Sequence, residues 1–166
     1  MSMPLTLKFP DLLYLEDYHG DFQKYFEAVY KVFESHFIHS KPLFLGNKVV
    51  AKKYPLEEGK YHRTFYHITH EGDDEHNRLP DLNRMKRIRF PKFVIESCPH
   101  PELLIWKNTR GRDTRVLIFN AEENYLVVLT VRKGVHLLCT AYLVNRNHTR
   151  QKLMEEYEAY KKTNTA

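Results

Sequence analysis

Four of the ten histidines in the chain fall within one short segment, His62–His76, that leads into an acidic loop. If the segment is helical, His67 and His70 lie on one helix face, where imidazoles serve acid–base catalysis or metal binding. A zinc site needs further ligands, usually Cys or carboxylate at a recognisable spacing, and the His-x-x-His pattern alone does not supply them. We therefore expect no metal and no cofactor here. The alternative for each histidine is a surface position or a hydrogen-bonded place in the core.

Positive charge is concentrated between Arg84 and Arg115, where nine Lys and Arg stand against three Asp and Glu, a net charge of +6. Guanidinium groups bind phosphate oxygens in pairs, and interleaved aromatic rings offer faces on which bases stack. The segment therefore predicts binding of RNA or of a single strand, although a solvated charged surface has the same composition. The residues expected to contact RNA are Arg84, Arg87, Trp106, Lys107, Arg112 and Arg115.

Several classes of enzyme have recognisable sequence motifs, and their absence here excludes some reactions. The chain has no glycine-rich phosphate loop, no Gly-x-Ser-x-Gly elbow and no paired-carboxylate motif, which argues against NTP-dependent chemistry. RNA cleavage needs none of these, because the 2′-hydroxyl is an internal nucleophile. It requires a base, a group that stabilises the charged phosphorane and an acid for the leaving oxygen, and His, Arg, Lys, Tyr and Thr can fill these roles.

The first half of the chain is predicted to be helical and must position this chemistry from one side. Apolar residues at three-to-four spacing predict an amphipathic helix over Asp21–Phe37, with Asp21 as its N-cap. Leu43–Leu45 and Val49–Ala51 read as two extended pieces joined by a Gly-Asn turn. A short helix is expected over Arg63–His70, and Glu71–Leu82 is expected to be an exposed loop.

The residue pattern of the second half is typical of an antiparallel meander. Four apolar clusters are separated by turn residues at hairpin spacing, and they are Leu103–Trp106, Val116–Phe119, Tyr125–Val131 and Val135–Val144. A last amphipathic helix is predicted over roughly Thr149–Tyr160. The expected fold is α+β: N-terminal helices, a four-stranded antiparallel sheet and a C-terminal capping helix. One face of such a sheet packs on helices and the other is available to a ligand.

Length and composition set the outer bounds. The chain of 166 residues, with a formal charge of +5 and an isoelectric point near 9.1, fits one domain over 1–166, with a helical N-terminal part over 1–50 and a core over 60–160. It has no apolar run of membrane-spanning length and no signal-peptide pattern. With only two cysteines, a cytoplasmic location is expected.

The closing strand reads GVHLLCTAYLV, from Gly134 to Val144. It resembles the last strand of the Barnase, EndoU, colicin and RelE-like (BECR) ribonuclease superfamily, in which a Thr-Ala-Tyr step recurs. From Lys60 to Tyr157 the chain is similar to a bacterial and phage group of that superfamily. The stretches that carry this similarity are RTFYHITHEG, RLPDLNRMKRIRFPKFVIE, the tryptophan strand, RGRDTRVLIF, YLVVLTVR and TAYLV.

The resemblance implies a metal-independent endoribonuclease of the toxin or phage-effector type, acting on tRNA or mRNA and held in check by an antitoxin or immunity protein. It implies that His67 is the acid–base residue, that Thr140 and Tyr142 orient or donate to the phosphate, and that Arg110 or Arg112 stabilises the phosphorane. EndoU-like enzymes use two histidines and a lysine. Here Lys107 and Lys133 are both candidates for the lysine, and the second histidine stays open among His62, His70 and His76.

Two other functions remain compatible with the sequence. A non-catalytic RNA- or DNA-binding module would use the same basic and aromatic face, with salt-dependent binding and no turnover. A protein-interaction domain would present the aromatic stripe of Asp21–Phe37 to a partner, although a stripe at this spacing more often belongs to a core.

Overall fold

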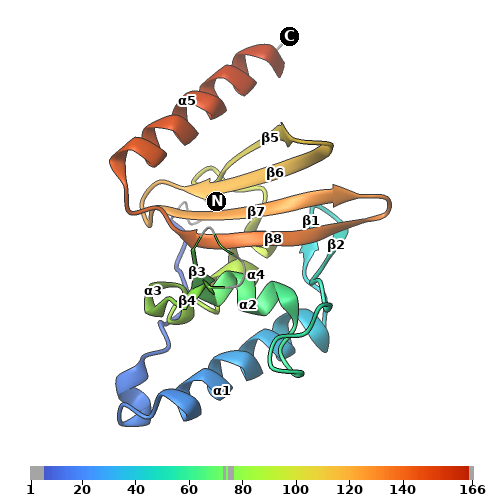
Figure 1. The fold of residues 1–166 in the computed structure, drawn as a ribbon. Coiled ribbons are helices and arrows are strands. Elements are labelled where there is room, and N and C mark those ends of the chain that lie inside the picture. The colour runs from blue at the N-terminus through green and yellow to red at the C-terminus, as the bar shows by residue number, and fades with distance from the viewer. Residues whose placement is uncertain (1–5, 73, 75–76, 165–166) are drawn as a thin grey trace, which may run out of the picture.

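The computed structural model describes residues 6–72, 74 and 77–164. Its elements form three layers, with a curled sheet between a group of helices on one side and a single C-terminal helix on the other (Figure 1). We call the sheet face toward the helix group the inner face and the face toward the C-terminal helix the outer face. The predicted α+β class is confirmed.

The sheet is six-stranded and mixed, so the predicted sheet of four antiparallel strands is correct only for its larger part. The strands are β1 (Leu43–Phe44), β2 (Asn47–Val50), β5 (Leu104–Arg110), β6 (Asp113–Asn120), β7 (Tyr125–Arg132) and β8 (Val135–Leu143), in the order β1-β2-β8-β7-β6-β5. The meander β5–β8 is antiparallel throughout. The two extra strands form the hairpin expected near Gly46, and β2 joins β8 in parallel.

The inner face is covered by helices, two of which were predicted, over Asp21–Phe37 and Arg63–His70. They are a short 3-10 turn (Leu15–Tyr18), α1 (Phe22–Phe33) with a π-helical end (Glu34–Ile38), α2 (Arg63–Thr69), α3 (Leu82–Met85) and α4 (Phe90–Ser97). The side chain of Asp21 accepts a hydrogen bond from the Lys24 amide at 3.1 Å, which confirms it as the N-cap of α1. Helices α3 and α4 lie inside the basic segment, and their charges obscured the apolar spacing.

The aromatic stripe of α1 forms the inner core and faces no partner. Tyr25, Phe26, Val29, Tyr30 and Phe33 are all buried, and they pack against residues of α2, α4 and the inner sheet face. A protein-interaction surface on this stripe is therefore excluded by its burial.

The outer face is covered in part by α5 (Asn147–Asn164), which packs across β5. Leu153, Met154 and Tyr157 of α5 pack on an apolar cluster that contains Trp106, Leu117 and Leu126, among others. Trp106 is only 1% exposed, and its indole N–H donates to Glu156 of α5 at 2.6 Å. The prediction that the Trp106 ring stacks on a base is therefore wrong, because the capping helix covers it.

A β-bulge divides β8 into two halves. Leu129 pairs with Leu138 and Val128 pairs with Thr140, so Cys139 has no partner across the ladder. Leu138 faces the inner core, and a regular strand would turn Thr140 and Tyr142 to the same side. The extra residue reverses the alternation, so both side chains lie on the outer face instead.

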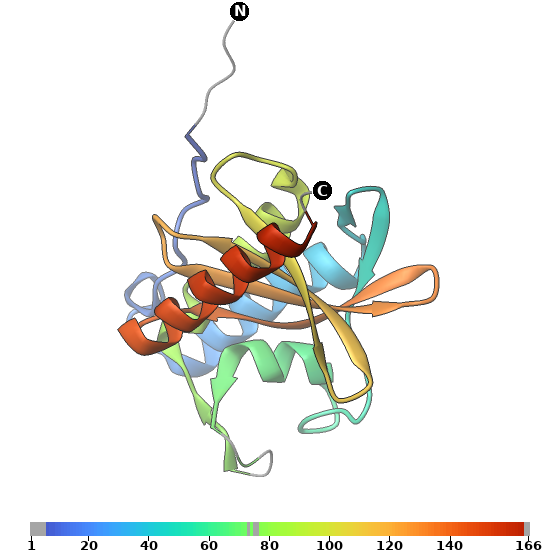
Figure 2. The ribbon, with the colours of Figure 1, turned by 90° about the horizontal axis from the view of Figure 1, so that it is seen from above.

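The chain between α2 and α3 forms a small ribbon beside β8. Strands β3 (His70–Glu71) and β4 (Leu79–Pro80) pair at its base, within the segment expected to be an exposed loop. Helices α2 and α3 both contact β8. Viewed from above, α2 and the β3–β4 ribbon lie along β8, in the lower part of the picture (Figure 2). Their side chains therefore reach the outer face around the edge of β8.

Candidate functional site

Three pockets follow β8 along its length and share residues with one another. The first, which we call the central pocket, has a volume of about 360 Å³ and is lined by Thr140 and Tyr142. The apolar pocket, of about 270 Å³, lies at Leu137–Cys139 and shares His67 with the central pocket. The polar pocket, of about 560 Å³, lies at the C-terminal end of β8 and shares Arg84 and Tyr142 with the central one. Together the three form a groove.

The central pocket brings together all four residues expected to be catalytic, from three separate elements. His67 comes from α2, Arg110 from β5, and Thr140 and Tyr142 from β8. Two residues expected to bind RNA, Arg84 and Arg115, line the same pocket. Its remaining lining residues are Gly72, Arg78, Leu117, Leu126, Val128 and Leu153.

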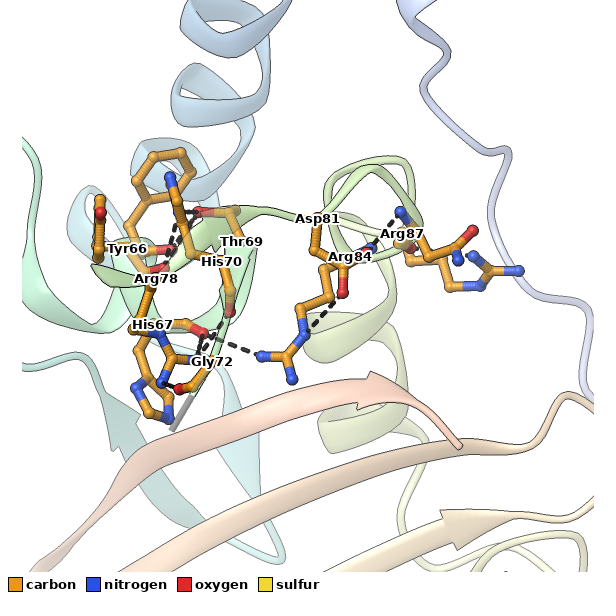
Figure 3. Close-up of polar contacts among 11 residues, drawn as sticks. Tyr66, His67, Thr69, His70, Gly72, Arg78, Asp81, Arg84 and Arg87 are labelled. Carbon is orange, nitrogen blue, oxygen red and sulfur yellow. Dashed lines mark hydrogen bonds and ion pairs between the residues drawn. The ribbon is translucent and has the colours of Figure 1, made fainter. Parts of the chain in front are cut away.

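The last turn of α2 holds His67 in place. Helix C-termini leave carbonyl groups without partners inside the helix, and cations near them are favoured by the helix dipole. The His67 carbonyl accepts from the guanidinium of Arg84 at 3.1 Å and from that of Arg78 at 3.3 Å (Figure 3). Arg78 also donates to the carbonyls of Gly72 and His70, each at 2.8 Å. The two arginines thus fix the backbone from which the His67 side chain projects.

Arg84 also positions Tyr142. Its guanidinium carbon lies 5.0 Å from the centre of the Tyr142 ring, a cation–π distance. The same guanidinium pairs with Asp81 at 3.3 Å, and both side chains are at most 16% exposed. Asp81 is itself the N-cap of α3, accepting from the amides of Asn83 and Arg84. A chain of contacts therefore runs from the start of α3 to the ring of Tyr142.

The opposite wall of the central pocket is held by the meander and α5. Arg115 on β6 donates through Nε to Asn108 on β5 at 3.1 Å. The Asn108 amide in turn donates to Glu156 at 2.7 Å, so α5 helps to fix Arg115. Arg110 at the end of β5 is exposed.

The charged side chains that line the central pocket are four arginines, and no Asp or Glu is among its lining residues in the described part of the chain. The charge of Arg84 is offset by its pair with Asp81, which lies just outside this lining. Such a site attracts an anion with several oxygens, which guanidinium forks bind in pairs. Within the same described part, no cluster of three or more His, Cys, Asp or Glu is arranged to hold a metal ion.

The remaining residues expected to contact RNA lie elsewhere. Arg87 donates to the Asn83 carbonyl at 3.0 Å and lies beside the Phe90 ring, directed away from Arg84 in Figure 3. Lys107 pairs with Val116 of the inner core, so strand alternation places it on the inner side of β5. Arg112 is in the exposed β5–β6 turn. The basic segment is therefore not one surface, because strand alternation and helix packing divide it.

Among the described residues, the candidates for a second catalytic histidine and for the lysine do not line the central pocket. His70 is 5% exposed and its ring stacks on Tyr66 at 3.8 Å, and burial lowers the pKa of His70 to about 4. The pKa of His62 is also lowered by burial, and its ring lies against Phe33. Lys133 is exposed in the β7–β8 turn, and His76 lies outside the described residues.

Two features of the groove had no signal in the sequence. Arg78 lies at the end of a segment dominated by acidic and turn residues, and only the folded ribbon brings it to His67. Arg146, just before α5, lines the polar pocket together with Asn83 and Thr149. The place of Arg78 depends on the pairing of β3 with β4, and that of Arg146 depends on a contact between segments far apart in the chain.

Comparison of the chain with protein-family models, with curated proteins and with solved structures found no match. Among the described residues, no helix is long and apolar enough to cross a membrane.

Proposed function

We propose that this protein is a metal-independent endoribonuclease and that the groove along β8 is its active site. The observation that carries the proposal is the central pocket, in which an imidazole and two hydroxyl side chains face four guanidinium groups without a carboxylate among the described lining residues. Acid–base groups beside a concentration of positive charge suit attack on a phosphodiester.

In the proposed reaction, His67 takes the proton of the ribose 2′-hydroxyl. The 2′-oxygen then forms a bond to the adjacent phosphorus, and the resulting phosphorane carries its extra negative charge toward Arg110 and Arg115. The P–O5′ bond breaks and the leaving oxygen receives a proton from Tyr142, with Thr140 donating to a phosphate oxygen. The products are a 2′,3′-cyclic phosphate and a 5′-hydroxyl. Each residue in this scheme lines the central pocket.

The proposal extends to the biological class of the enzyme. A toxin or phage effector acting on tRNA or mRNA in the cytoplasm, restrained by an antitoxin or immunity protein, fits the resemblance of the closing strand. Toxicity on expression that disappears in a Tyr142→Phe variant would support this class.

The test is cleavage of total bacterial RNA in EDTA, followed by mapping of the new ends. Tyr142→Phe removes one hydroxyl, and His67→Asn removes the imidazole. We expect each to lower cleavage at least a hundredfold, the lower end of a typical acid–base contribution of about 10²–10⁴. Matched controls are Tyr160→Phe on α5 and the exposed His39→Asn, which lie outside the central pocket.

We expect the wild type and both control variants to produce discrete 2′,3′-cyclic phosphate ends, and we expect neither pocket variant to produce them. Intact RNA, or full activity in both pocket variants, would overturn the assignment. RNA that stays intact but binds with a strong dependence on salt would identify a non-catalytic binding module in the same groove.

A further inference from the structure

The apolar pocket next to His67 differs in chemistry from the rest of the groove. Its walls include Pro55, Leu137, Leu138 and Cys139, whereas the central pocket beside it is lined by arginines. Arg63 also lines the apolar pocket, but it pairs with Glu57 at 3.0 Å and donates to the Pro55 carbonyl at 3.0 Å. Its charge is therefore already balanced, which leaves Lys52 as the other cation in the lining of this pocket.

We propose that the apolar pocket binds the nucleobase on the 5′ side of the bond that is cut. This inference rests on the proposed ribonuclease activity. A volume of about 270 Å³ lies just below the ~300–1,000 Å³ of pockets that hold whole drug-sized ligands, and it suits a fragment such as one base. Apolar walls take the faces of a base, and the hydroxyl of Thr130 in the same lining can bond to its edge. The hydroxyl oxygen of Thr64 already accepts from the Lys52 amide at 2.7 Å.

The order of the pockets determines which base is bound. His67 lines both the apolar and the central pocket, so it lies between the base site and the phosphate site. In a nucleotide, the ribose joins its base to the phosphate on its 3′ side. A base in the apolar pocket therefore places its own 2′-hydroxyl at His67 and its 3′-phosphate among the arginines, which is the arrangement that attack by that hydroxyl needs.

Cys139 lets occupancy of this pocket be measured without cleavage. It lines the pocket, and the other cysteine provides an internal control. Burial raises the pKa of the Cys98 thiol to about 12, and its sulfur donates to the Val94 carbonyl, so Cys98 reacts slowly with alkylating agents. Iodoacetamide labelling followed by mass spectrometry then reports on Cys139, and a Cys139→Ala variant confirms the labelled site.

The probes are the four nucleoside 3′-monophosphates, with inorganic phosphate as the control that lacks a base. At ten times its dissociation constant, a nucleotide that fills the pocket leaves about a tenth of the sites free, so labelling of Cys139 slows about tenfold. Inorganic phosphate should leave the rate unchanged. A Leu137→Trp variant, which fills the pocket, should change the nucleotide preference on the 5′ side of the cut and leave the 3′ side as it was.

The outcomes separate the two proposals. Labelling that no nucleotide slows, in a protein that cleaves RNA, overturns the base site and leaves the ribonuclease intact. Slowing by nucleotides and by phosphate alike also overturns it. Slowing by nucleotides alone in a protein that does not cleave RNA supports the base site and refutes the catalytic proposal.

Discussion

Protonation of His70 should weaken the fold beneath the groove. The ring is buried between Tyr66 and the end of α2, with Nδ1 3.1 Å from the Tyr66 carbonyl, and the His70 carbonyl accepts from Arg78. Burial lowers the pKa of His70 from its ordinary 6.5 to about 4. The imidazole of His70 therefore binds a proton more tightly in the unfolded chain than in the folded protein. The contribution of the neutral His70 ring to the free energy of unfolding is complete above pH 6.5 and falls as the pH drops toward 4.

The size of the effect follows from the two pKa values. Between pH 7.5 and pH 4.5, the difference in proton binding lowers the free energy of unfolding by about 2–3 kcal/mol through this group alone. Carboxylates and the other histidines add their own pH dependence, so the comparison must be made against a variant. His70→Asn keeps a donor near the Tyr66 carbonyl and removes the titration.

The assay is urea unfolding at both pH values, followed by the fluorescence of Trp106, which is the only tryptophan and is buried. We expect the wild type to lose about 2–3 kcal/mol more than His70→Asn on acidification. Equal losses in the two proteins would show that His70 does not titrate in this way and would refute the reasoning.

Further expectations concern the helix caps and the charges. Asp21→Ala should lower the free energy of unfolding by about 1 kcal/mol through loss of the α1 cap, measured by urea unfolding. Trp106→Phe removes the indole bond to Glu156 and should lower the free energy of unfolding by about 1–2 kcal/mol, measured by urea unfolding followed by circular dichroism because this variant has no tryptophan; an unchanged stability would contradict that contact. Arg110→Gln should reduce the slope of log affinity against log salt for RNA by about one, whereas Lys107→Gln, on the other side of β5, should leave it unchanged.

Local pattern was enough to predict much of the fold. The amphipathic spacing of α1 and the alternation of the meander strands are properties of contiguous residues, so both were predicted close to their observed bounds. The parallel pairing of β2 with β8 joins Val49 to His136 across about half of the chain, and nothing near either residue signals it. Helix α4 was hidden by the arginines and lysines around it, although Pro91 stands at a favoured helix-starting position.

For the groove, too, some residues could be predicted from the sequence and others could not. The resemblance of the closing strand singled out Thr140 and Tyr142, and the histidine-rich segment together with that resemblance singled out His67; the three residues line one pocket. The burial of Trp106 under α5 could not be foreseen, because a tryptophan in a strand can face either a helix or solvent. The role of Arg78 depends on a hydrogen bond to a backbone carbonyl, and such bonds carry no sequence signature.

The unpaired Cys139 has a consequence for how this gene can change. Because the residue count between Leu138 and Thr140 determines which side chains meet water and which meet the core, loss of a single codon there would exchange the two sets for the rest of β8. Substitution at Cys139 alters one side chain, but deletion alters the environment of every residue that follows in the strand. We therefore expect the number of residues at this point of β8 to be more important for folding than the identity of residue 139. A library of deletions and substitutions scored for folding would measure the difference.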